Sequence, residues 1–329
     1  MTNLNLIIRE FDLNYADGVR RLYEKCGYKF SSRLVDIWMK YERFSKVLLA
    51  IVNGEVVGKV TFDIAYKPYA EIVNLIVHPN YRGLGIGSKL VEECISRAKI
   101  NGFNIIYLMT DIDNRIAHKL YSKYNFIPTI LPGKRSKRKF LWLFKFLDET
   151  FMGEFKSKHP FIQYITFRKR ISFMKRKFYC LKIFDPISND QVMLYFRGQP
   201  GQVIDGTCPR IAGLKLKIDD YYFGLIIKNE ELKDNFVETE LRIMNFGKHK
   251  VRINNIEHVI PFGIKFISDV KAENVLIDSY GSLNFKFKYK ITNDFIFPEL
   301  SFKTILVSYY IYFGNLFNYP LIITAGFNW

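Results

Sequence analysis

A glycine-rich turn separates an apolar run from a helix-like pattern in the first third of the chain. The run reads as a buried strand that ends at Val77, and apolar residues then recur with helical spacing as far as Ala98. The glycines of the turn are Gly83, Gly85 and Gly87. Backbone N–H groups at the start of a helix attract an anion, and missing side chains let it approach the main chain closely. The sequence therefore predicts a phosphate-binding turn.

The order of residues in this turn excludes two other phosphate-binding motifs. A P-loop ends in Gly-Lys-Ser or Gly-Lys-Thr, whereas this turn ends in Gly87-Ser88-Lys89. A dinucleotide fingerprint has the order G-x-G-x-x-G, and here the order is G-x-G-x-G.

Two segments in the first 147 residues together resemble one enzyme family. Arg82-x-x-Gly85-x-Gly87, within the phrase VHPNYRGLGIG, resembles the acetyl-CoA pyrophosphate loop of the GNAT superfamily of N-acetyltransferases. The downstream phrase YLMTDIDNRIAHKLYSKYNFIPT, residues 107–129, resembles the strand, Asn-started helix, Leu-Tyr pair and closing Phe of that superfamily. The resemblance implies that acetyl-CoA is the co-substrate and a primary amine the acceptor.

The resemblance also implies which residues hold acetyl-CoA. The end of the strand before the turn would align the acetyl group and the pantetheine arm through backbone hydrogen bonds, and the turn would bind the pyrophosphate. Asn114 would contact the pantetheine arm while it also caps a helix. The expected cofactor-binding residues are Leu75, Ile76, Val77, Arg82, Gly83, Leu84, Gly85, Ile86, Gly87, Ser88 and Asn114.

Three residues are candidates for proton transfer. A phenol is a suitable acid for a leaving thiolate, and Tyr121 matches the usual acid of the resembling family. Glu71 begins the central strand and Asp111 lies near the end of the next one, so either carboxylate could act as the base through a water molecule. Some protein N-terminal acetyltransferases of the resembling family carry Glu or His where this chain has Met109, so the identity of the base stays open. For Glu71 and for Asp111 alike, the alternative is a solvated carboxylate without a catalytic role.

The order of helix and strand patterns in residues 1–147 is β-α-α-β-β-β-α-β-α-β-β. This order predicts an α/β (α+β) GNAT fold with a central mixed sheet. The clearest local signal is Asn53-Gly54 between two β-branched runs, which is typical of a hairpin turn. The resemblance does not extend beyond residue 147.

The rest of the chain has a different character. From residue 221 onwards apolar and polar residues alternate with a period of two, as in Leu283 to Ile291, and turn residues separate the runs. We expect an all-β sandwich of immunoglobulin type at 221–329, after a basic connector with a strand-rich part at 148–220. The uncharged stretch 304–329 predicts two strands joined by a turn, with a membrane-spanning tail as the alternative.

Positive charge is concentrated in one segment. The chain has a formal net charge of +17, and residues 134–180 hold 14 Lys and Arg against 3 Asp and Glu. This segment has three interpretations: a solvated connector, a nucleic-acid groove in which rings stack on bases, or a field that attracts CoA or an acidic protein.

The four cysteines do not form a metal-binding pattern. Cys26, Cys94, Cys180 and Cys208 are scattered, without a C-x-x-C pair, so no metal site is expected. Cys26 and Cys94 lie in helical apolar patterns and are expected to be buried free thiols. The N-terminal residues do not resemble a signal peptide, and the cytoplasm is the expected compartment.

The sequence thus predicts an acetyl-CoA-dependent N-acetyltransferase that acts by direct transfer, with a protein N-terminus or a lysine as the favoured acceptor. Two other classes remain open: a GNAT-fold protein that binds CoA without turnover, and a nucleic-acid-directed protein that uses residues 134–180. The sandwich is expected to serve recognition or association, and the oligomeric state is not predicted.

Overall fold

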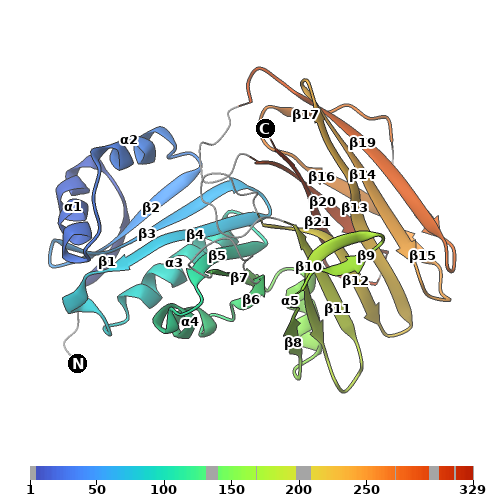
Figure 1. The fold of residues 1–329 in the computed structure, drawn as a ribbon, viewed down its shortest axis with the longest axis horizontal. Coiled ribbons are helices and arrows are strands. Elements are labelled where there is room, and N and C mark those ends of the chain that lie inside the picture. Colours follow the sequence, from blue (N-terminus) through green and yellow to red (C-terminus); the bar gives the residue numbers. More distant parts are fainter. Residues whose placement is uncertain are drawn as a thin grey trace. The chain divides into compact units, whose positions relative to one another are not determined.

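The protein was analysed as a computed structural model that describes residues 5–130, 140–167, 169–197, 209–270, 272–295, 304–314 and 316–328 (Figure 1). The chain forms two compact units. The first comprises residues 1–110 and 114–127, and the second comprises 111–113 and 128–329. The three-part division at residues 147 and 220 stays a prediction.

The predicted mixed sheet is present, with strand order β1-β2-β3-β4-β5-β7-β6. Neighbouring strands are antiparallel from β1 to β4, and β4 is parallel to β5. The elements are β1 (Leu6–Glu10), η1 (Leu13–Tyr15), α1 (Ala16–Lys25), α2 (Ser32–Lys40), β2 (Ser45–Val52), β3 (Glu55–Tyr66), β4 (Tyr69–Val77), η2 (Pro79–Tyr81), α3 (Ile86–Ile100), β5 (Ile105–Asp111), α4 (Arg115–Ser122), β6 (Ile127–Ile130) and β7 (Phe140–Phe146).

The expected hairpin turn joins β2 to β3. Asn53 and Gly54 both have positive φ, 50° and 82°, which is the conformation that a type I′ turn requires. The elements predicted for residues 1–147 agree with the structure in type and order, with small differences at their ends.

Helices cover both faces of the first five strands. On one face α1 and α2 pack their apolar side chains against β2, in a cluster that includes Leu22, Trp38 and Leu49. On the other face α3 approaches β3 so closely that a Cβ on Gly58 would lie 3.0 Å from Ile86 and 3.2 Å from Leu90. Glycine at position 58 therefore leaves room for close packing of the helix on the strand, and a larger residue would require the neighbouring side chains to shift.

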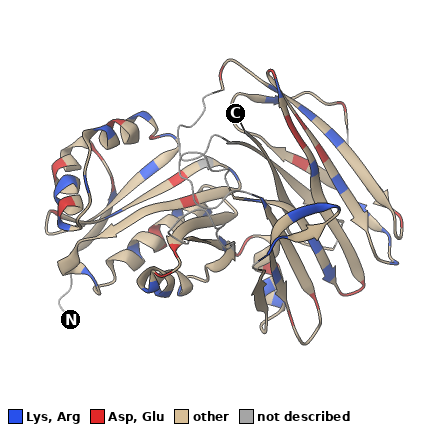
Figure 2. Cartoon of the chain, viewed as in Figure 1, with Lys and Arg blue, Asp and Glu red and all other residues tan. Residues whose placement is uncertain are grey.

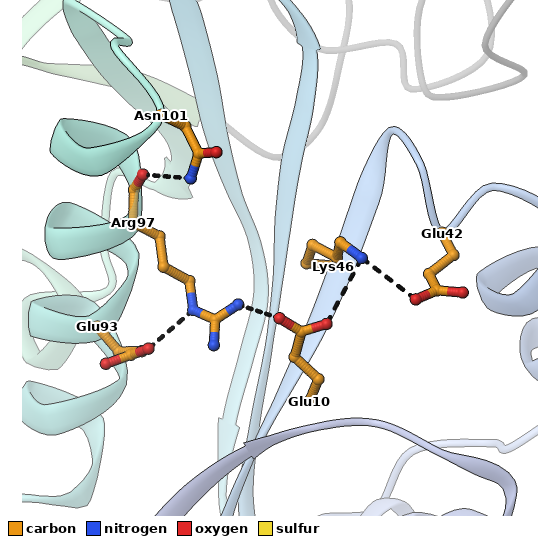
Figure 3. A network of polar contacts seen from close by, with 6 residues as sticks. All are labelled: Glu10, Glu42, Lys46, Glu93, Arg97 and Asn101. Carbon is orange, nitrogen blue, oxygen red and sulfur yellow. Dashed lines mark hydrogen bonds and ion pairs between the residues drawn. The ribbon is translucent and has the colours of Figure 1, made fainter.

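A polar network holds α3 against the first two strands (Figure 3). The Arg97 guanidinium pairs with Glu10 of β1 and, at 2.8 Å from Nε, with Glu93 of its own helix. The second oxygen of Glu10 lies 3.5 Å from Lys46 of β2, which also pairs with Glu42 at 3.2 Å. The network fixes the C-terminal half of the helix whose N-terminus forms the glycine-rich turn.

The second unit is built mainly from antiparallel strands. β8, β10–β14, β17 and β19 form the continuous part of a nine-stranded sheet, in the order β17-β19-β14-β13-β12-β11-β10-β8, and β9 pairs with β10. A three-stranded sheet has the order β16-β20-β21, and β15 pairs with β18. The elements are α5 (Phe151–Lys158), β8 (Gln163–Thr166), β9 (Ile171–Phe173), β10 (Arg176–Phe184), β11 (Gln191–Arg197), β12 (Arg210–Ile218), β13 (Tyr221–Lys233), β14 (Phe236–Asn245), β15 (Val251–Ile253), β16 (Asn255–Val259), β17 (Ile264–Phe266), β18 (Val275–Ile277), β19 (Ser282–Ile291), β20 (Thr304–Tyr312) and β21 (Leu321–Asn328).

The two larger sheets of this unit pack face to face. β21 contacts β12 and β13. Within the larger sheet, the Arg210 guanidinium of β12 lies 2.9 Å from Glu230 of β13, and the Glu230 carboxylate accepts the N–H of Gly326 of β21 at 2.9 Å, which links the two sheets. The strands β8 and β10–β12, which fall in the segment expected to be a basic connector with a strand-rich part, belong to the larger sheet. The expected pair of strands in 304–329 is also present, as the antiparallel β20 and β21.

Alternation along β14 and β19 gives the larger sheet one charged face. Lys286, Lys288 and Lys290 are exposed on β19, and Glu238 of β14 lies 2.8 Å from Lys288. Figure 2 shows the basic and acidic positions of the chain in colour. Within the described ranges, no helix is both long and apolar enough to cross a membrane.

Helix α5 was not predicted from the sequence. It is only eight residues long, and its aromatic and basic residues follow no clear period. Its N-terminus is capped by Thr150, whose hydroxyl accepts the N–H of Gly153 at 3.1 Å. The buried Glu154 accepts hydrogen bonds from the backbone N–H and side chain of Asn318, at 3.0 and 2.9 Å. This helix therefore depends on a contact with a residue 164 positions away, which local sequence patterns do not reveal.

Candidate active site

The glycine-rich turn lies between β4 and α3, as the sequence predicts. Gly83 and Gly85 have φ of 81° and 84°, a region that side chains disfavour. Gly85 is the N-cap of α3, and no side chain makes a capping hydrogen bond there. The first N–H groups of a helix have no partner within the helix, so the start of α3 presents donors to an anion.

The side chains of this turn differ in what they contact. The Arg82 Nε donates to the carbonyl of Val77 at 3.1 Å, which closes the turn over the end of β4. Leu84 is exposed and Ile86 is buried in the core. A Cβ on Gly87 would meet Leu120, Leu75 and Val77 at 3.5–3.7 Å, which is ordinary contact. Gly83 and Gly85 are thus required by their conformation, and Gly87 places the start of α3 near α4.

The end of β4 separates from its parallel neighbour. Register pairs between β4 and β5 run from Tyr69 to Ile72, and none is recorded for the remaining described residues of β4. Asn74 has a φ of 50°, and the pairing with β3 shifts at the same place, so β4 contains a bulge there. Leu75, Ile76 and Val77 follow this bulge; Ile76 is buried and the other two are half-buried.

Helix α4 carries two of the predicted residues. The Asn114 Oδ1 accepts the N–H of Ala117 at 3.1 Å, which confirms that Asn114 caps the helix. The Tyr121 side chain is buried, with 6% exposed, and meets Phe126 edge-on at 5.5 Å between ring centroids. Burial raises the pKa of Tyr121 above its ordinary value, and proximity to Cys94 adds to this. The phenol therefore keeps its proton at neutral pH.

A residue that the sequence analysis did not select joins α4 to the turn. Tyr124 donates from its hydroxyl to the carbonyl of Ser88 at 3.2 Å and to Glu92 at 3.0 Å. Tyr124 lies two residues beyond the end of α4, so helical spacing does not identify it, and the contact appears only in the tertiary structure.

Glu71 lies in a buried polar row across four strands. Ser45 of β2 is opposite Asp63 of β3, Asp63 is opposite Glu71 of β4, and Glu71 is opposite Tyr107 of β5. Tyr107 donates from its hydroxyl to Glu71 Oε2 at 3.1 Å, and Ser45 donates to Asp63 Oδ1 at 2.5 Å. Lys59 lies four residues before Asp63 on the same face of β3, where its register partners are Leu49 of β2 and Ile76 of β4.

Burial sets the protonation of this row. It raises the pKa of Glu71 well above its usual value, and the adjacent Asp63 raises it further, against the effect of the Tyr107 hydrogen bond. Burial raises the pKa of Asp63 to about 6 and lowers the pKa of Lys59 to about 7. A carboxyl with a raised pKa is suited to accept a proton near neutral pH.

Asp111, the second candidate base, has a different setting. It is the last residue of β5 and falls in the second compact unit. Its Oδ1 accepts the N–H of Asp113 at 3.0 Å, so the carboxylate supports the turn that leads to α4. Its role as a base stays a prediction.

The cysteines of the described chain are free thiols: Cys94 and Cys180 are buried and Cys26 is half-buried. Cys208 lies outside the described residues. Among the residues that the structure describes, no cluster of three His, Cys, Asp or Glu side chains could hold a metal ion.

Comparisons with known proteins agree with this architecture. The model of the acetyltransferase (GNAT) family matches residues 17–126. An acetyltransferase of Pectobacterium atrosepticum is 31% identical over 135 residues, which cover 39% of this chain and 94% of that protein. The chain therefore belongs to the GNAT family of acetyltransferases.

Two other relatives share a smaller part of their length. An uncharacterised N-acetyltransferase of Methanocaldococcus jannaschii is 36% identical over 81 residues, 23% of this chain and 36% of that protein. The aminoalkylphosphonate N-acetyltransferase of Salmonella typhimurium is 33% identical over 97 residues, 28% of this chain and 59% of that protein. This chain thus matches between about a third and three fifths of the length of these two relatives.

Proposed function

We propose that the first unit transfers an acetyl group from acetyl-CoA directly to a primary amine. The observation that carries the proposal is the contact of α4 with the start of α3: Leu120, the neighbour of Tyr121, lies beside Gly87. The helix that carries the expected acid therefore packs against the start of the helix at the expected pyrophosphate site. Membership of the GNAT family supports the same reaction.

In the proposed reaction each proton has a defined route. The lone pair of the neutral amine attacks the thioester carbonyl, and the nitrogen loses a proton to Glu71, directly or through water. The C–S bond of the tetrahedral intermediate then breaks, and the leaving thiolate takes the proton of Tyr121. Solvent carries the proton of Glu71 back to the Tyr121 phenolate, so both residues return to their starting states. The raised pKa of Glu71 and the protonated Tyr121 are both suited to these roles.

The cofactor would be held mainly by the main chain. The pyrophosphate would accept hydrogen bonds from N–H groups between Arg82 and Ser88, and the pantetheine arm would contact β4 from Leu75 to Val77 and Asn114. The positive φ of Gly85 and the uncapped start of α3 support this assignment.

The test is titration calorimetry with acetyl-CoA, on the wild type and on Gly85→Val. Binding by the wild type and its loss in Gly85→Val are expected, because valine disfavours a φ of 84° and would displace the N–H groups. Gly27→Val is the matched control, since Gly27 also has a positive φ, 75°, and open space around its Cβ position. Absence of binding by the folded wild type would refute the proposal.

For the acceptor we propose a protein N-terminus or a lysine side chain. The sequence of residues 106–126 supports this choice, because it resembles the GNAT branch that acetylates protein N-termini or lysines. A different acceptor, an aminoalkylphosphonate, is suggested by the name of one relative. A panel separates these acceptors: a peptide with a free N-terminus and no lysine, an N-blocked peptide with one lysine, and an aminoalkylphosphonate. Acetylation of the phosphonate alone would reject the protein acceptor.

The nucleic-acid alternative depends on exposed aromatic rings in residues 134–180. Among the described residues of this segment, Phe144, Phe146, Phe151, Phe155 and Phe178 are buried, and Phe161 and Tyr164 are exposed. Most of these rings therefore fill the core instead of facing solvent. Binding of RNA with a steep salt dependence would favour this alternative, because phosphate contacts release counterions.

A further inference from the structure

We propose that Asp63 is a positioning residue for the base: Asp63 and Glu71 hold one proton between them, and Lys59 balances the remaining negative charge. The proposal rests on the proposed function, in which Glu71 accepts the proton of the amine. It adds Asp63 and Lys59 of β3 to the candidate active site.

The two carboxyls are direct neighbours across two strands. Asp63 and Glu71 are antiparallel register partners, and such partners have Cβ atoms about 4.5–5.5 Å apart on the same face of a sheet. Asp63 is 8% exposed and Glu71 is 9% exposed. Two adjacent buried carboxylates repel each other strongly, so one of the two retains a proton.

Each carboxyl has its own fixed donor. Ser45 donates to Asp63 from β2, and Tyr107 donates to Glu71 Oε2 from β5. These donors come from the two outer strands of the row, so they orient both carboxyls within the sheet. The pair is therefore built into the backbone register and does not depend on a flexible loop.

Lys59 supplies the balancing charge. It lies four residues before Asp63 on β3, is 0% exposed, and donates to the Thr61 hydroxyl at 2.5 Å. Its Nζ lies 4.9 Å from the centroid of the Trp38 ring, a cation–π contact from α2. Below the lowered pKa of Lys59, about 7, one cation, one carboxylate and one protonated carboxyl leave these buried groups without net charge.

The groups that face the pair come from three strands. Lys59 lowers the pKa of Asp63 by its charge, Asp63 raises the pKa of Glu71, and Tyr107 opposes that rise. Tyr69 of β4 contacts the Tyr107 ring edge-on at 6.2 Å. Because coupled carboxyls titrate as a pair, the pair loses its shared proton at the upper of its two apparent pKa values, and only then can Glu71 accept the proton of the amine.

The two β3 residues should therefore act in opposite directions. Asp63→Asn removes the negative neighbour, so the proton affinity of Glu71 falls about tenfold or more. Lys59→Met removes the positive neighbour, so the proton affinity of the pair rises. If Asp63 and Lys59 served only to stabilise the fold, the two variants would not be expected to shift the pKa of Glu71 in opposite directions.

The experiment is a carboxyl ¹³C NMR titration of the full chain without substrate, with Glu71 assigned through Glu71→Gln. We expect the apparent pKa of Glu71 to fall in Asp63→Asn, to rise in Lys59→Met, and to stay unchanged in the control Asp36→Asn, which removes an exposed acid of α2. An unchanged Glu71 titration in folded Asp63→Asn would overturn the proposal. If that variant does not fold, an unchanged or lowered value in Lys59→Met would overturn it.

Kinetics then separate this inference from the proposed function. If the protein acetylates an amine, the acidic limb of kcat/KM should move to lower pH in Asp63→Asn and to higher pH in Lys59→Met. If no amine is acetylated, the proposed function fails, whereas the NMR titration still decides whether the two carboxyls share a proton.

Discussion

The hydroxyl of Tyr124 donates a hydrogen bond to the backbone carbonyl of Ser88 at 3.2 Å. This contact ties the end of α4 to the first turn of α3. Tyr121 lies one turn before Tyr124, and Ser88 lies three residues after Gly85. The proposed acid and the proposed pyrophosphate site are therefore held in a fixed relation by two adjacent helices.

Replacement of Tyr121 by phenylalanine should slow transfer without weakening cofactor binding. The phenyl ring keeps the packing against Phe126, whereas the proton donor for the thiolate is lost. We expect kcat to fall by about 10²–10⁴, the usual contribution of a general acid. Calorimetry should give an unchanged Kd for acetyl-CoA. An unchanged kcat would assign the acid role elsewhere, and Tyr28→Phe, at a side chain that is 57% exposed and outside the site, is the control for loss of a tyrosine hydroxyl.

Replacement of Glu71 by glutamine should remove the base. We expect kcat/KM to fall by about 10²–10⁴ at neutral pH, with a smaller loss at high pH, where more of the amine is already deprotonated. Asp111→Asn tests the second candidate base by the same assay. A loss confined to Asp111→Asn would transfer the role of base to Asp111.

The pH dependence of stability should reveal the Glu10–Arg97 pair. The hydrogen bond from Arg97 lowers the pKa of Glu10, so this pair stabilises the fold above the ordinary pKa of glutamate and stops doing so as the pH falls through the lowered value. A double-mutant cycle with Glu10→Gln and Arg97→Gln should give a coupling free energy of about 0.2–1 kcal/mol at pH 7, which is typical of partly exposed pairs.

The control for this cycle is Arg20→Gln. Arg20 pairs with Asp17 and Glu24 on the exposed surface of α1, so its loss should change the free energy of unfolding little. Chemical unfolding at pH 7 and at pH 3 measures the coupling free energy of the Glu10–Arg97 pair and the effect of the control variant. A coupling that persists unchanged at pH 3 would contradict the assignment to an ionised Glu10.

Replacement of Glu230 by glutamine should strongly destabilise the second unit. The Glu230 side chain is 8% exposed and lies between Arg197 and Arg210, so the change leaves buried positive charge without a partner. Breaking a buried pair in this way costs about 3–5 kcal/mol. Glu238→Gln, which removes an exposed partner of Lys288, should change the free energy of unfolding by less than about 1 kcal/mol. Equal effects of the two variants would be inconsistent with this account.

Local signals were sufficient for much of the first unit. The Asn53-Gly54 turn, the strand that ends at Val77 and the helix that begins after Gly85 were predicted from neighbouring residues, because turn chemistry and apolar period are local properties. In the second unit, alternation predicted strands such as β19, but it did not show that β10–β12 continue the same sheet. Pairing between strands depends on residues far apart in the chain.

The sequence by itself determined the family resemblance, the glycine-rich turn and the identity of Tyr121 and Glu71 as candidates, since each is encoded in a short stretch. Only the tertiary structure decided that Asp63 lies opposite Glu71 and that Lys59 is buried on the same face of β3. Asp63 lies eight residues from Glu71 along the chain, and the register of β3 against β4, with its shifts, decides that they are opposite each other. The protonation of that row depends on its burial, which arises only when the strands and helices pack together.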